Sequence, residues 1–227
     1  MSIKFIIAII IALLNIFLGL IILRKNYKNP SNIYYAGLCM SGGLWALFQS
    51  LLFIVNSQLF LDFVYKCIYI FAIFPPFFYL MFTYHHPYKL WVYPQWLIKL
   101  IYFLPLAYFC LILFGFMDFN VVRFINGTAT QNIIFNNFLF FTIYFFFYIV
   151  WGILILFKKF KNTERVHRIH IKYIIMATVI TFIITGIVNV IMPLLDNFTY
   201  DWLGGFFILI NFICIGYLIF IKPKVLR

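Results

Sequence analysis

The chain has 227 residues, of which 66% are hydrophobic and only 10% are charged. A soluble domain needs roughly a quarter of its residues charged to cover its surface, so this composition excludes a soluble globular protein and indicates that lipid surrounds most of the chain. The formal net charge of +12 would suit nucleic-acid binding in a soluble protein, and the placement of the basic residues must decide between that interpretation and a membrane one.

About 20 apolar residues in a helix cross a hydrocarbon core of about 30 Å. The sequence contains seven such runs, at about 5–23, 33–55, 60–84, 97–117, 133–157, 171–195 and 203–221. The second follows the turn and capping sequence Asn29-Pro30-Ser31-Asn32, the third contains Pro75-Pro76, and the fourth contains Pro105. We therefore predict an all-α polytopic membrane protein in which residues 1–227 form a single seven-helix transmembrane domain.

The basic residues alternate between the two sides of this predicted bundle. Of the 17 Lys and Arg residues, all but Lys4, Lys66 and Arg123 lie in or next to the connections after the first, third and fifth runs or follow the seventh. Because cytoplasmic loops retain basic residues, this pattern predicts an external N-terminus and a cytoplasmic C-terminus in the plasma (cell inner) membrane. It also argues against nucleic-acid binding, since the positive charge is spread over loops and not gathered on one face.

Polar residues within the spans are candidates for a ligand site, because an unpaired polar group in lipid is costly. Gln49, Asn189 and Asn211 lie in the second, sixth and seventh runs, and Trp45 lies one turn from Gln49 on the same helical face. These four residues could line a pocket open to the outside. The alternative is that they fix the bundle by interhelical hydrogen bonds, each contributing about 0.6 kcal/mol. Pro193 frees a backbone carbonyl and gives the sixth helix a place to bend.

Other motifs give no sign of catalysis. Glu164, His167 and His170 have a metal-ligand spacing, but only one such motif exists and basic residues crowd it, so a solvated helix end is expected and no metal or cofactor. The four cysteines fall within predicted spans and are expected to be reduced. Neither a phosphate-binding glycine loop nor a Ser-His-Asp set is found, which predicts that the chain is not an enzyme.

The external loop after the fourth run contains the sequence Asn126-Gly127-Thr128. It is a potential glycosylation site, which matters only in an organism that glycosylates there. The alternative, which we favour, is a glycine turn between two short extended pieces at 120–125 and 128–132.

Four stretches share a common pattern with one family. They are Gly42-Gly43-Leu44-Trp45-Ala46-Leu47, the double proline with its phenylalanine-rich run at 75–84, the loop at 165–175 with the following 189–193, and the exit from the last run at 217–226. Together they resemble the N-terminal seven-transmembrane sensor region of bacterial histidine kinases. One loop position departs from the family, since His167 stands where glutamine is common.

The resemblance implies a receptor-like module that detects an external or intramembrane signal and passes it through the seventh helix to a cytoplasmic kinase. The residues after Ile221 include neither a phosphoacceptor-histidine helix nor an ATP-binding segment. The expected partners are therefore a second copy of the chain or a separate histidine kinase, together with an unknown small-molecule or lipid-like ligand. The alternatives are a small transporter or channel, which would need a continuous polar lining, and an accessory membrane scaffold.

Overall fold

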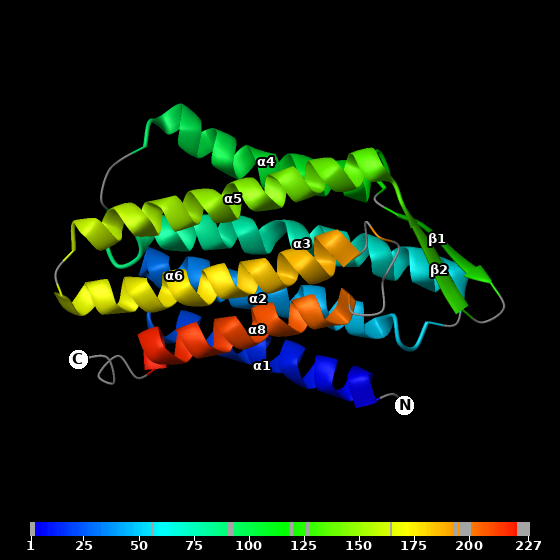
Figure 1. The fold of residues 1–227 in the computed structure, drawn as a ribbon, viewed down its shortest axis with the longest axis horizontal. Helices are drawn as coiled ribbons and strands as arrows, with labels where there is room; N and C mark the ends of the chain where they lie inside the picture. The colour runs from blue at the N-terminus through cyan, green and yellow to red at the C-terminus, as the bar shows by residue number, and fades with distance from the viewer. Residues whose placement is uncertain are drawn as a thin grey trace.

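A computed structural model describes residues 3–55, 57–89, 93–118, 120–125, 128–163, 165–192, 195 and 201–221. Within these residues seven helices run side by side as a bundle, and a two-stranded hairpin extends from one end of it (Figure 1). The first helix begins, and the last described helical turn ends, at opposite ends of the bundle (Figure 1). Apart from the hairpin, the fold is all-α as predicted.

The helices are α1 (Ile3–Lys25), α2 (Pro30–Leu51), α3 (Gln58–His85), α4 (Gln95–Leu113), α5 (Phe135–Lys161), α6 (Arg165–Gly186) and α8 (Asp201–Gly216). Two of them continue into π-helical turns, α6 into η1 (Ile187–Ile191) and α8 into η2 (Tyr217–Ile221). A π turn adds a residue to the backbone hydrogen-bonded ring and often marks a functional position in a helix.

Among the described residues, five helical spans are long and apolar enough to cross a membrane: those of α1, α3, α4 and α5, and the span formed by α6 with η1. Helix α2 has the length, but its Ser, Gly and Gln residues lower its hydropathy, and the apolar part of α8 is shorter. Large apolar side chains project outward from the bundle, for example Phe17 and Phe103, each 62% exposed. Such a surface suits lipid and not water, and it supports the prediction of a multi-pass membrane protein.

Capping residues set where the helices begin and end, and hydropathy does not reveal these positions. Asn29 accepts a hydrogen bond from the Ser31 N–H at 2.9 Å, and Pro30 takes the first helical position, so α2 starts three residues before the apolar run at 33–55. The helix ends at Leu51, within that run. Helix α4 ends at Leu113, where Gly115 takes a φ of +74°.

The hairpin joins α4 to α5. Strand β1 (Asn120–Ile125) pairs antiparallel with β2 (Thr128–Ile133), with Ile125 opposite Thr128 at its tip. The two extended pieces predicted from the sequence are therefore present. Asn126, the residue of the potential glycosylation site, lies outside the described residues.

Two adjacent glycines let three helices pack closely. A Cβ on Gly43 of α2 would lie 2.8 Å from the Ala12 carbonyl oxygen and 2.7 Å from Ile16 Cγ1, both on α1. A Cβ on Gly42 would lie 2.9 Å from the Phe212 ring of α8. Real Cβ atoms do not come this close to backbone, so the pair allows α1 and α8 to approach α2 on two sides.

Pro105 in α4 removes the N–H that would bond the Ile101 carbonyl one turn earlier. The hydroxyl of Tyr148, a fully buried residue of α5, donates to this carbonyl at 2.7 Å. The hydrogen bond satisfies a backbone group that would otherwise be unpaired in lipid, and it joins α4 to α5.

We expect Tyr148→Phe to lower the free energy of unfolding by about 1–2 kcal/mol, because it leaves the Ile101 carbonyl buried and unpaired. In a Pro105→Ala background the alanine N–H can bond that carbonyl, so the same substitution should cost much less. The measurement is a double-mutant cycle of unfolding in detergent or nanodiscs. Equal costs in both backgrounds would contradict the assignment.

At the end of the bundle opposite the hairpin, a lysine is buried among backbone carbonyls. Lys159 of α5 is 1% exposed, and its Nζ donates to the carbonyls of Thr83, Tyr84 and His86 at 2.7, 2.9 and 2.7 Å. These carbonyls are at the C-terminus of α3, where backbone acceptors have no partner within the helix and the helix dipole favours a cation. We call this the Lys159 end of the bundle.

Candidate functional site

A cavity of about 50 Å³ lies between α2, α3, α5, α6 and α8. We call it the central cavity. Its wall includes Trp45 and Tyr35 of α2, the double proline and Tyr79 of α3, and residues from the other three helices: Phe145, Ile149, Ile174, Thr178, Thr181, Phe182, Thr185, Ile208, Asn211, Phe212 and Ile215. Leu38 and Phe82 complete it.

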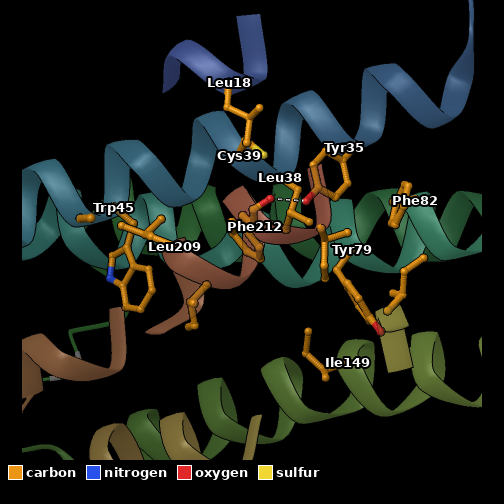
Figure 2. Packing of buried hydrophobic residues seen from close by; sticks show 14 of the residues in the cluster. Leu18, Tyr35, Leu38, Cys39, Trp45, Tyr79, Phe82, Ile149, Leu209 and Phe212 are labelled. Carbon is orange, nitrogen blue, oxygen red and sulfur yellow. Dashed lines mark hydrogen bonds between the residues drawn. The ribbon is translucent and has the colours of Figure 1, made fainter. Parts of the chain in front are cut away.

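Figure 2 shows how α2, α3, α5 and α8 meet in this wall. Tyr35 and Leu38 of α2 face Phe212 of α8, and Tyr79 of α3 points toward α5, where Ile149 lies. The approach of Tyr79 to α5 depends on Gly152, since a Cβ there would lie 2.5 Å from the tyrosine ring. The site thus combines segments far apart in the sequence.

Two of the four residues predicted for the ligand pocket lie in the wall of the central cavity. Trp45 is 8% exposed, and Asn211 anchors α8 to α6 by donating from Nδ2 to the Ala177 carbonyl at 3.3 Å. The side-chain oxygen of Asn211 is buried and has no hydrogen-bond partner among the described residues.

The other predicted residues lie elsewhere. Gln49 lines a separate hollow of about 20 Å³ between α1, α2 and α8, where its Oε1 lies against Gly205. Asn189 lies in η1 and is not among the residues that line either space, and its buried Oδ1 has no partner in the part of the chain that the structure describes. Pro193, the predicted bend, lies outside the described residues, but the π turn η1 places an irregularity shortly before it.

The polar residues of the remaining wall were not predicted from the sequence. Thr178, Thr181 and Thr185 follow one face of α6 at spacings of three and four, which is a recognisable signal for a polar stripe. Thr185 Oγ1 is buried without a partner among the described residues. Tyr79 Oη lies beside Thr178 but makes no hydrogen bond of normal geometry.

Tyr35 connects the cavity with the backbone of the last helix. It is 1% exposed, and its hydroxyl donates to the Phe212 carbonyl at 2.6 Å. The same hydroxyl interacts with the amide of Gly216, whose missing side chain leaves room for the tyrosine ring. In a regular α-helix the Phe212 carbonyl and the Gly216 amide would bond each other. A side chain placed between them accounts for the change to π geometry at Tyr217.

The C-terminal end of the last helix is fixed by contacts at the Lys159 end of the bundle. The Phe220 ring packs against Tyr35, with centroids 5.0 Å apart, and its carbonyl accepts a hydrogen bond from Lys25 Nζ of α1. His86 packs nearby, with its ring 6.3 Å from Phe220. Burial and the positive charge of Lys159 lower the pKa of His86 to about 3, so this histidine is neutral at physiological pH.

The described wall of the central cavity has no acidic or basic side chain. Among the described residues, no group of three or more His, Cys, Asp or Glu could hold a metal ion, and the four cysteines are free.

Comparison with known proteins identifies the family. The profile described as the N-terminal 7TM region of histidine kinase matches residues 6–221, nearly the whole chain. The matched region does not include a kinase domain. A search of curated proteins found no match. The match agrees with the resemblance seen in the four sequence stretches, and the chain belongs to the family of N-terminal seven-transmembrane sensory input regions of histidine kinases.

Proposed function

We propose that this input region detects its signal by binding a small molecule in the central cavity, and that it passes the signal through α8 and η2. In this proposal the protein lies in the plasma membrane, with its N-terminus outside the cell and the Lys159 end in the cytoplasm. At that end η2 would act on a kinase, either within a homodimer or on a separate polypeptide.

The observation that carries this proposal is the position of Tyr35. Its ring belongs to the wall of the cavity and also contacts Phe220 in η2, while its hydroxyl bonds the Phe212 carbonyl of α8. A ligand that moves Tyr35 or Phe212 would therefore change the backbone of the last helix directly. Such a ligand shifts the output only if it binds one arrangement of α8 and η2 more tightly than the other.

Removing the tyrosine hydroxyl tests this route. In Tyr35→Phe the Phe212 carbonyl loses its donor, and backbone amides in 212–221 should exchange hydrogen about fivefold faster, because a buried hydrogen bond contributes about 1 kcal/mol. The measurement is hydrogen exchange by mass spectrometry in nanodiscs. A parallel assay joins the full chain to the kinase domains of a characterised histidine kinase, where the variant should change basal phosphorylation several-fold.

Tyr34→Phe is the matched control. The Tyr34 hydroxyl pairs with the Tyr102 hydroxyl of α4, so this variant also loses a tyrosine hydrogen bond, but one that does not involve α8. It should leave exchange in 212–221 and the kinase output unchanged. If both variants behave alike, signal transfer through Tyr35 is wrong.

A further inference from the structure

The wall of the central cavity contains three polar atoms whose hydrogen-bonding capacity is unused. They are Asn211 Oδ1, Thr185 Oγ1 and Tyr79 Oη, all buried. Thr185 is 7% exposed and Tyr79 is 5% exposed. A buried polar atom without a partner costs about 1–3 kcal/mol, so three of them around one space indicate a partner that fills it.

The position of each atom is fixed by its own helix. Asn211 is held against α6 at Ala177 by its Nδ2, which leaves its carbonyl oxygen unpaired. Tyr79 reaches α6 one residue further on, beside Thr178. Thr185 lies two turns along the same face of α6, about 12 Å from the level of Ala177 at 1.5 Å per residue. The unpaired groups therefore follow one face of α6.

The donors and acceptors define what the partner must offer. The Asn211 oxygen can only accept, so the partner must donate at least one hydrogen bond. The hydroxyls of Thr185 and Tyr79 can donate or accept. A hydroxyl or amide group on the partner meets both requirements.

The apolar residues of the wall determine the chemistry of the rest of the partner. It is formed by aliphatic, aromatic and proline side chains, including Leu38, Pro75 and Phe182, and its described residues provide no opposite charge for an ion. Burying an unpaired ion costs several kcal/mol, which excludes an anion or a cation. Water alone is a poor occupant, because each buried molecule needs two to four polar partners and most of this wall has none.

We infer that the central cavity binds an uncharged, largely hydrocarbon molecule that carries a hydroxyl or amide group. Asn211 accepts a hydrogen bond from that group, Tyr79 at the same level of α6 completes its hydrogen bonding, and the hydrocarbon part lies against the aromatic wall beside Trp45. This inference rests on the proposed function, because it takes the same cavity as the site where the signal is detected.

Quenching of Trp45 tests the ligand class. The chain has five tryptophans, and replacing Trp91, Trp96, Trp151 and Trp202 by phenylalanine leaves Trp45 as the only emitter. In nanodiscs this protein is titrated with three bromine-labelled probes of equal chain length, kept short to suit a cavity of about 50 Å³: 3-bromopropanol, 1-bromopropane and 3-bromopropanoate. We expect saturable quenching by the alcohol, with an affinity about fivefold higher than that of the alkane, and no saturable quenching by the carboxylate.

Two substitutions locate the hydrogen bonds. Tyr79→Phe and Asn211→Leu should each lower the affinity for the alcohol about fivefold, toward the level of the alkane, and leave alkane binding unchanged. Thr142→Val is the control, because the Thr142 hydroxyl bonds the Phe138 carbonyl of its own helix and the residue is not part of the cavity wall. It should change neither affinity.

The contrary outcomes overturn either the ligand class or binding in the cavity itself. Equal saturable quenching by alcohol and alkane, unaffected by both substitutions, would overturn the ligand class and leave the cavity as a binding site. Saturable quenching by the carboxylate would also overturn the class. Quenching that rises linearly with every probe would overturn binding in the cavity, and with it the proposed site of detection.

Discussion

Replacing Lys159 by methionine is expected to lower the free energy of unfolding by about 3 kcal/mol, because hydrogen bonds to a charged group contribute about 1.5–3 kcal/mol each and part of the loss is recovered by removing a buried charge. The lysine ammonium has three donors, and three carbonyls converge on it at the C-terminus of α3. Methionine has a similar length but cannot donate, so all three acceptors lose their partner.

Two further variants separate charge from geometry at this position. Lys159→Arg keeps the charge, but its planar, forked donors do not match three carbonyls that converge on one point, so it should restore only part of the stability. Lys161→Met removes an exposed lysine of the same helix end and should leave stability nearly unchanged. Thermal unfolding of the purified protein in nanodiscs measures all three. A Lys159→Met protein as stable as Lys161→Met would show that the carbonyls do not need the lysine.

Replacing Gly43 by alanine is expected to cost about 2 kcal/mol of stability, because the new methyl group would overlap the backbone of α1. The closest backbone atom is the Ala12 carbonyl oxygen, which cannot turn away as a flexible side chain would. We expect the first helix to shift outward, which unfolding curves and crosslinking between α1 and α2 would detect.

Gly186→Ala is the matched control for this prediction. Within the part of the chain that the structure describes, its added Cβ would meet only the Phe146 ring at 3.8 Å, an ordinary contact, and alanine has the higher helix propensity. This variant should be as stable as the original protein or slightly more stable. Similar losses at Gly43 and Gly186 would mean that helix propensity, and not close approach of two backbones, controls stability at these positions.

Much of the fold could be predicted from the sequence because lipid imposes a simple requirement on it. Runs of about 20 apolar residues mark the spans, and the loops between them are short, so the order of the helices follows. Exact ends could not be predicted, since Asn29 and Pro30 start α2 by local hydrogen bonding and backbone geometry that hydropathy does not record.

The site was predicted only where polarity in lipid is conspicuous. Asn211 was predicted because it is a polar residue within an apolar run. Trp45 was predicted because it lies one turn from Gln49 on the same helical face. Gln49 turned out to line a different hollow, because the rotation of each helix about its axis depends on packing against its neighbours. Thr185 was missed because threonine is common in spans and usually bonds its own helix, as Thr142 does.

Lys159 shows the limit of interpreting charge from sequence position. Its neighbours are loop cations, and the sequence placed it among them as a solvated residue. Its carbonyl partners lie more than 70 residues earlier in the chain, at the end of another helix. Only the packing of α3 against α5 brings them together.

The hydrogen bond from Lys25 to the Phe220 carbonyl has a consequence for biogenesis. The two residues are 195 positions apart, and a ribosome adding about 5–20 residues per second needs on the order of ten to forty seconds to make that stretch. During this time the newly inserted first helix has to satisfy its terminal lysine with water or lipid headgroups. The Tyr35 hydroxyl likewise lacks its acceptor until Phe212, 177 positions further along the chain, has been synthesised. These two hydrogen bonds therefore form only after the last helix has been made, and that helix enters a membrane in which Lys25 and Tyr35 are already present.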